Sequence, residues 1–363
     1  MPMTDRERFF RVMHYQPVDQ PPLRLVGVWA DTLERWYREG LPRGADPHEH
    51  LGVKPMGMAN ISGQTLAWPP FERRVLEEHE DHTVEIDDYG RKVKRFKAST
   101  SVPEWLEYPI ESPADLRRVM DERFAVDQAA LDARFPAGWE DSVRRADTLG
   151  VPVAINVGWY YWTLRSLAGV ETASYLVHDA PALVEELFER INVIALDGIT
   201  RAVGLTRLDV MIFGEDIAYK NGPFISPAMH QKLLSPRYRR IMDLARAHGC
   251  DVGWMGSDGD LRLLVPQYLE VGVNCLEPCE VAAGMVPVEL RRQFGPQLLM
   301  VGGLDKRAVA VGPKAIDSEI ERNRSLMEEG GYLPSIDHSV SADISWSNYC
   351  YFIEALMRAL GIA

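Results

Sequence analysis

The stretch that decides the fold runs from residue 273 to residue 301 and reads VNCLEPCEVAAGMVPVELRRQFGPQLLMV. It begins with a short apolar run, continues through a helical pattern at residues 286–294, and ends with a second short apolar run at residues 298–301. Short buried strands that alternate with helices are typical of βαβ units, whose strands are parallel. The stretch therefore predicts an α/β fold built on a parallel sheet.

The same alternation continues on both sides of this unit. Four further apolar runs after residue 150 have the length of buried strands, at residues 151–157, 208–213, 250–254 and 332–336. Helical patterns accompany them at residues 181–203, 226–248, 261–270, 313–329 and 346–360. Six strands after residue 150, with one or two before it, predict a (β/α)8 TIM barrel. An open doubly wound sheet is the alternative, but the glycine-rich phosphate turns G-x-G-x-x-G and G-x-x-x-x-G-K-[ST] do not occur.

In the first 150 residues, strand and helix patterns alternate less regularly. Thr4 and Glu7 form a capping box that predicts a helix over residues 5–14, and residues 23–28 have the pattern of a strand. Residues 73–97 alternate in β-like runs around a turn signal, which predicts a β-hairpin. We therefore expect a single domain over residues 1–363, in which residues 1–150 form an elaborated N-terminal region and residues 151–363 form the regular βα units.

The composition excludes several classes of protein. The 363 residues include 40 Lys and Arg against 53 Asp and Glu, a formal net charge of −13, which argues against binding to nucleic acid or anionic lipid. The most apolar stretch, residues 151–162, is too short to cross a membrane and contains Asn156. Four cysteines in a chain of this length are not a disulfide framework, so a cytoplasmic protein is the default expectation. We also expect a small-molecule substrate.

Acidic residues follow five successive predicted strands. In an α/β barrel the chemistry lies on the loops at the carboxyl ends of the strands, so these residues should share one rim. The acids that begin these loops are Glu215, Asp216, Asp258, Glu277, Asp305 and Asp337. His338 stands beside them as the strongest general acid or base in the sequence. The rim is therefore expected to be acidic, with one histidine in it.

These loops supply the candidate site residues. The predicted catalytic residues are His338, Asp216 and Glu215. The predicted substrate-binding residues on these loops are Tyr219, Lys220, Asp258, Glu277 and Asp305. Each has a purely structural alternative: Asp258 and Asp305 are suited to cap helices, and His338 could be a core histidine. A metal site of Glu215, Asp216, Glu277 and His338 is a further hypothesis, because such ligands suit zinc, iron or manganese.

Two other groups resemble metal motifs. Cys275 and Cys279 are spaced as a zinc clip would be, but no second pair accompanies them, so two buried thiols are the preferred interpretation. His79 and His82 stand in the acidic run at residues 77–82, which we interpret as a solvated face.

Several of these segments carry a resemblance to a known family. The chain resembles the uroporphyrinogen decarboxylase superfamily, which also contains methylcobamide:thiol methyltransferases. The segments that resemble it are residues 4–8, 19–22, 257–260, 272–274, 277–278, 302–305 and 337–338. The resemblance implies a (β/α)8 barrel, a homodimer, and a site in which His338 matches the family's C-terminal histidine. It also implies that Tyr160, within residues 159–161, binds substrate as the family's tyrosine region does.

The sequence departs from both characterised branches of that superfamily. The Arg-Gln-Ala-Gly-Arg motif of the decarboxylases is absent from the corresponding residues 24–29, and their Phe-Ser-Asp segment has no counterpart. The His-x-Cys zinc ligands of the methyltransferases are absent from residues 254–256. Three hypotheses follow: a decarboxylase-like lyase using acid/base chemistry on an organic substrate other than a polyanionic porphyrinogen, a methyltransferase that works with a corrinoid protein, and a non-catalytic binding member.

Overall fold

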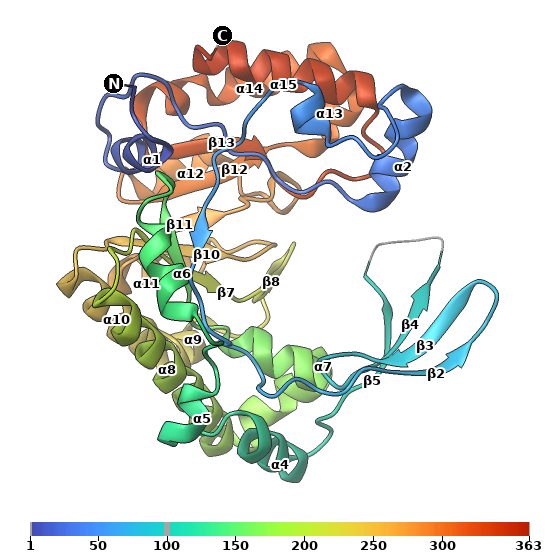
Figure 1. Cartoon of the computed structure of the whole chain (residues 1–363), viewed down its shortest axis with the longest axis vertical. Helices are drawn as coiled ribbons and strands as arrows, with labels where there is room; N and C mark the ends of the chain where they lie inside the picture. Colours follow the sequence, from blue (N-terminus) through green and yellow to red (C-terminus); the bar gives the residue numbers. More distant parts are fainter. Residues whose placement is uncertain (1, 98–101, 363) are drawn as a thin grey trace.

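The main sheet has seven parallel strands and curls around a filled interior (Figure 1). The computed structural model describes residues 2–97 and 102–362. The order across the sheet is β1 (Ala59–Asn60), β6 (Val153–Asn156), β7 (Val210–Gly214), β10 (Val252–Gly256), β11 (Val273–Glu277), β12 (Leu299–Leu304) and β13 (Tyr332–Ile336). The α/β class is confirmed, and each of the six strands expected after residue 150 is present.

Helices cover the outer face of this sheet (Figure 1). They are α7 (Tyr160–Asp179), α8 (Pro181–Val203), α9 (Pro227–Leu233), α10 (Ser235–Ala247), α11 (Val265–Val271), α12 (Pro287–Phe294), α13 (Lys306–Val311), α14 (Pro313–Glu329) and α15 (Trp346–Leu360). The single helix expected over residues 226–248 is two helices, and α7 was not predicted. The first turns of α7 are buried on nearly every side, so they lack the polar face that marks a surface helix in sequence.

The eighth strand is only partly formed. The predicted strand at residues 23–28 is an extended segment whose one bridge joins Val28 to Val340. The amide of Met56 donates to the carbonyl of Leu23 over 2.7 Å on one side, and on the other the amide of Val340 donates to the carbonyl of Gly27 over 2.9 Å. The segment is thus bonded at one end to the residues that precede β1 and at the other end to the residues that follow β13, rather than along a full ladder.

Alternate side chains of the strands fill the interior of the curled sheet. Ala154, Val210, Trp254 and Cys275 belong to this buried cluster, as the alternation of a strand requires. Helix α1 (Asp5–Met13) packs against the same cluster, and the amide of the glycine that precedes β13 donates to a carbonyl of α1. Helix α1 therefore plugs the amino-terminal end of the sheet, and the opposite end is left for a site.

The N-terminal region adds short helices and a projecting arm. The helices are α2 (Ala30–Glu39), α3 (Pro47–His50), α4 (Pro113–Arg123), α5 (Gln128–Asp132) and α6 (Trp139–Ala146). The arm is an antiparallel sheet of β2 (Arg74–Glu78), β3 (His82–Ile86), β4 (Lys92–Phe96) and β5 (Glu104–Glu107). Strands β3 and β4 are the predicted hairpin, and the arm stands away from the body (Figure 1).

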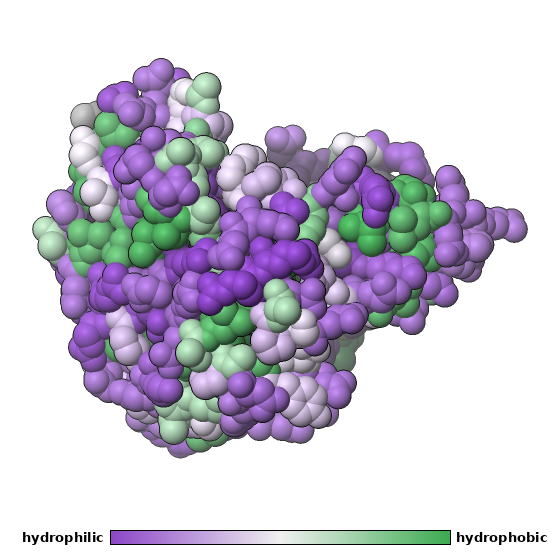
Figure 2. All heavy atoms as spheres, turned by 90° about the horizontal axis from the view of Figure 1, so that it is seen from below, coloured by the Kyte–Doolittle hydropathy of each residue, from purple (hydrophilic) through white to green (hydrophobic). Residues whose placement is uncertain are grey.

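The surface of the arm is mixed in character. Apolar side chains gather there among hydrophilic ones when the molecule is seen from below (Figure 2), and Val75 and Trp105 are among the exposed ones. His79 and His82 pair with neighbouring carboxylates on this arm, as a solvated face would. In the described part of the chain, no helix is long and apolar enough to span a membrane.

The capping box of α1 gives the first testable prediction. The hydroxyl of Thr4 accepts a hydrogen bond from the amide of Glu7, and the carboxylate of Glu7 accepts one from the amide of Thr4. Thr4→Ala removes the first of these bonds and should lower the free energy of unfolding by about 1 kcal/mol. Urea unfolding followed by circular dichroism measures this loss. Thr4→Ser retains the hydroxyl and is the matched control, so an equal loss in both variants would contradict the capping role.

Candidate active site

A cavity of about 610 Å³ opens at the carboxyl ends of the strands. Its wall draws residues from the ends of β6, β7, β10 and β11, from the loop after β13, and from the extended segment at residues 24–27. The polar side chains that line it are Arg24, Asn156, Trp159, Asp216, Ser257, Asp258, Glu277 and His338. Because the carboxyl ends of parallel strands meet at one rim, side chains up to 314 positions apart in sequence share this wall.

Asp258 and His338 face each other across the cavity. Asp258 follows β10 and His338 follows β13, and the His338 Nε2 lies 3.7 Å from the Asp258 Oδ2. Trp29 packs against the imidazole of His338 in an edge-to-face arrangement, with the ring centres 5.7 Å apart. Burial raises the pKa of the Asp258 carboxyl, the neighbouring Asp216 carboxylate raises it further, and His338 acts in the opposite direction. The two groups thus lie within ion-pair distance of each other at the rim.

The other carboxylates of the rim are paired with arginines. Asp216 lies 3.4 Å from the guanidinium of Arg165, and Glu277 lies 3.1 Å from that of Arg24. Trp254 also donates its indole N–H to Glu277 over 3.1 Å. The expected acidic rim is therefore largely neutralised. Of the carboxylates that are open to the cavity, Asp258 is the one whose cationic partner is a titratable imidazole.

Glu215 lies behind the cavity wall as an anchor for helix α7. Its side chain is fully buried and accepts hydrogen bonds from the amides of Tyr160, Tyr161 and Trp162 at 2.9–3.2 Å. The hydroxyl of Tyr238 donates a fourth bond over 2.8 Å. A carboxylate at a helix amino terminus is favoured by the free N–H groups there. The four hydrogen bonds lower the pKa of Glu215, but burial outweighs them and raises it to about 7.

This anchor positions one aromatic side of the cavity. Trp159 directly precedes α7 and lines the cavity, with its indole packed over Gly214 at the end of β7. A Cβ at position 214 would overlap the indole ring, so glycine is required for this close approach. The bonds that hold the start of α7 on Glu215 therefore also fix Trp159 in the wall.

The structure separates the predicted site residues into two groups. Asp216, Asp258, Glu277 and His338 line the cavity together, and Glu215 contributes to its wall while its carboxylate faces α7. The predicted substrate-binding residues Tyr160, Tyr219, Lys220 and Asp305 do not line it.

Each of these four has a different structural place. Tyr160 is buried and donates its hydroxyl to Asn192 over 2.7 Å. Tyr219 and Lys220 are exposed at the short hairpin of β8 (Ala218–Tyr219) and β9 (Gly222–Pro223). Asp305 caps α13 and pairs with Arg307 at 2.8 Å, which confirms the capping alternative for that residue.

Sequence reasoning did not select several residues that line the cavity. Arg24, Asn156 and Trp159 line it and were not among the candidates. Asn156 carried a detectable signal, because it is a polar residue at the carboxyl end of an apolar strand. Arg24 stands near the beginning of the predicted strand at residues 23–28, so the rule that selects carboxyl ends of strands did not single it out.

The hypothetical metal ligands do not form a metal site. Within residues 2–97 and 102–362, no three His, Cys, Asp or Glu side chains converge as a metal would require. The carboxylate of Glu215 is bound to backbone N–H groups, and that of Glu277 is bound to Arg24 and Trp254. Cys275 and Cys279 are both buried and free, and burial raises the pKa of the Cys279 thiol to about 12.

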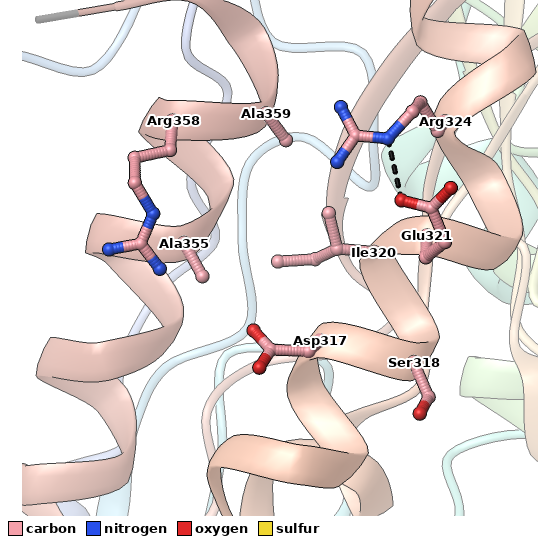
Figure 3. A pocket seen from close by; sticks show the side chains of 8 residues that line it. All are labelled: Asp317, Ser318, Ile320, Glu321, Arg324, Ala355, Arg358 and Ala359. Carbon is pink, nitrogen blue, oxygen red and sulfur yellow. Dashed lines mark hydrogen bonds and ion pairs between the residues drawn. The ribbon is translucent and has the colours of Figure 1, made fainter.

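A second hollow lies on the outside of the molecule between α14 and α15. It has a volume of about 480 Å³ and is lined by charged and small side chains (Figure 3). Arg324 donates to Glu321 over 2.6 Å, and Asp317 accepts from the hydroxyl of Tyr351. This hollow is remote from the strand ends that assemble the Asp258–His338 pair, so the cavity at the strand ends is the candidate active site.

Comparison with known proteins shows a shared fold. No protein family profile matches the chain, and no curated protein matches its sequence. A solved structure of a methyltransferase from Methanosarcina mazei matches over 98% of this chain and 99% of its own, with 14% identity and a TM-score of 0.63. The chain therefore shares the overall fold of that methyltransferase over nearly its whole length.

Two further solved structures match less well. A B12-independent methionine synthase from Shewanella sp. W3-18-1 matches over 63% of this chain and 67% of its own, with 10% identity and a TM-score of 0.37. A putative vitamin-B12 independent methionine synthase from Listeria monocytogenes matches over 62% of this chain and 70% of its own, with 10% identity and a TM-score of 0.35. These scores are too low to establish a shared fold.

The anchoring role of Glu215 predicts a large effect on stability. Glu215→Ala leaves three buried amides and the Tyr238 hydroxyl without their acceptor. We expect the free energy of unfolding to fall by about 3 kcal/mol or more, measured by urea unfolding. Glu321→Ala removes an exposed carboxylate from α14 and should change the same quantity by less than about 1 kcal/mol. Equal effects in the two variants would contradict the anchoring role.

The raised pKa of Glu215 predicts a pH dependence of stability. The pKa of Glu215 lies at about 7 in the folded protein against an ordinary value of 4.5, so the folded state holds this proton more tightly than the unfolded state. The contribution of this group to the free energy of unfolding is therefore complete below pH 4.5 and is lost as the pH rises toward 7. Glu215→Gln cannot ionise and should lack this component when unfolding is measured from pH 4 to pH 8.

Proposed function

We propose that the protein is an enzyme that uses the Asp258–His338 pair for general acid/base catalysis on a small organic substrate bound in the cavity. The observation that carries this proposal is the pairing of charges at the rim. Asp216 and Glu277 have arginine partners that stay charged, whereas Asp258 has an imidazole partner that can gain and lose a proton. The cavity volume of about 610 Å³ is in the range of small-molecule sites.

The geometry supports a simple division of roles. A proton shared between Asp258 and His338 can be given to one atom of a substrate and taken from another without leaving the cavity. The side-chain amide of Asn156, at the end of β6, is suited to hold a polar group of the substrate in the cavity. Trp159 supplies an aromatic wall, so a substrate with both an apolar part and a polar part fits best.

We further propose that the reaction is a methyl transfer. The shared fold with a methyltransferase favours this class. In such a reaction, the acid/base pair would take the proton of the acceptor group while the acceptor forms its bond to the methyl carbon and the donor leaves with the electron pair of the broken bond. A methylcorrinoid held by a separate protein is one donor that supplies an activated methyl group.

Decarboxylation is less well supported by the cavity. A substrate with several carboxylates needs several cationic groups, and Arg24 is the one arginine that lines the cavity, where it is already bound to Glu277. Zinc activation of a thiol acceptor also has no support, because the residues present do not form a ligand set. The acceptor is therefore expected to be activated by the acid/base pair itself.

The proposal predicts that the pair is required for turnover. Methyl transfer from methylcobalamin to a panel of thiols and hydroxyl compounds is followed by the absorbance of the corrinoid, and release of CO2 from a panel of organic acids is followed in parallel. With the substrate found, His338→Asn and Asp258→Asn should each lower kcat by about 10²- to 10⁴-fold. Lys220→Ala, which alters an exposed residue outside the cavity, is the control and should retain full activity.

Two results would contradict the proposal. Full turnover in both His338→Asn and Asp258→Asn would remove the pair from the chemistry. Release of CO2 without any methyl transfer would replace the proposed reaction class with decarboxylation.

A further inference from the structure

The backbone of Asp216 has an unusual conformation at the rim. Its φ of +42° lies in the left-handed region. Among the described residues other than glycine, only Tyr15 and Cys279 also have a positive φ. This region disfavours residues that carry a Cβ, and glycine is the residue that normally fills it. Residues held there despite the cost are concentrated at functional sites. A carboxylate at this position therefore calls for an explanation.

The conformation places the Asp216 carboxylate between two elements. One oxygen, Oδ1, accepts a hydrogen bond from the amide of Asp258 over 3.4 Å, at the end of β10. The other, Oδ2, lies 3.4 Å from the Nη2 of Arg165 on α7. The side chain is about half exposed and lines the cavity. Asp216 is thus held beside the acid/base pair without touching His338.

The charge of Asp216 acts on the neighbouring carboxyl. The groups whose charges act on Asp258 are Asp216, His338, Glu280 and Lys306. A carboxylate beside Asp258 disfavours a second negative charge there, so it favours the form of the pair that retains a proton. Arg165 lies 3.4 Å from the Asp216 carboxylate, and a positive charge at that distance is expected to offset part of this effect.

We propose that Asp216, held beside Asp258 by the amide of that residue, is a positioning residue whose carboxylate favours the protonated form of the Asp258–His338 pair, and that Arg165, the ion-pair partner of Asp216, weakens this effect. The inference rests on the proposed function, which makes this pair the acid and base. It assigns Asp216 a role other than direct proton transfer, and it adds Arg165, which does not line the cavity, to the machinery.

The test measures the ionisation of Asp258 in the free protein. The side-chain carboxyl signals of protein labelled with ¹³C-aspartate are followed by NMR over pH, and Asp258→Asn identifies the signal of interest. Asp216→Asn is the decisive variant, because asparagine tolerates the left-handed conformation and removes only the charge. We expect the pKa of Asp258 to fall by about half a pH unit or more in this variant.

Three further variants sharpen the result. Arg165→Met removes the offsetting positive charge and should raise the pKa of Asp258. Asp216→Glu retains the charge and should leave the titration close to that of the wild type. Asp317→Asn makes the same chemical change in the outer hollow between α14 and α15, and no shift is expected. Circular dichroism and melting temperatures establish that each variant is folded.

The outcomes are distinguishable from a failure of the proposed function. An unchanged titration in both Asp216→Asn and Arg165→Met would overturn the positioning role, whatever the enzyme turns over. Shifts of the expected signs without any detectable turnover would support the positioning role and count against the proposed reaction. With a substrate found, the acid limb of the pH profile of kcat should move to lower pH in Asp216→Asn, while a merely structural role would lower kcat equally at every pH.

Discussion

The bond between the Glu215 carboxylate and the first amides of α7 is the interaction on which the candidate site depends. It joins the end of β7 to the start of α7, and the hydroxyl of Tyr238 ties α10 to the same carboxylate. Helix amino termini leave N–H groups without partners, and a buried acceptor is needed where water is excluded. Because Trp159 immediately precedes α7, the same bonds set one wall of the cavity.

The second organising feature is the way in which charges are distributed at the rim. An arginine whose pKa is far above neutral fixes the charge of its carboxylate partner, whereas an imidazole leaves its partner free to change. Arg165 and Arg24 come from α7 and from the extended N-terminal segment, far in sequence from the acids they meet. Asp258 therefore differs from Asp216 and Glu277 because its partner is a histidine and not an arginine.

The N-terminal region contributes more to the site than its irregular sequence suggests. The segment at residues 24–27 completes the cavity wall on the side where the sheet has no regular eighth strand. The arm reaches the same wall through aromatic contacts: Tyr89 meets Trp162 with ring centres 5.4 Å apart, and Trp162 meets Trp159 with ring centres 5.2 Å apart. The projecting arm and the cavity are therefore parts of one packed structure.

The sequence by itself determined the α/β class, the strands after residue 150, the hairpin of the arm and the place of His338 among strand-end acids. These depend on local patterns: short apolar runs, helix caps, and the rule that parallel strands end at one rim. Only the tertiary structure decided the direction in which each side chain points. In the folded chain, Glu215 accepts hydrogen bonds from the start of α7, and Tyr160 is buried and donates to Asn192. Asp305 caps α13, and Arg24 pairs with Glu277. The pattern of a strand records which residues are buried, but the partner that a charged side chain meets depends on segments far away in sequence.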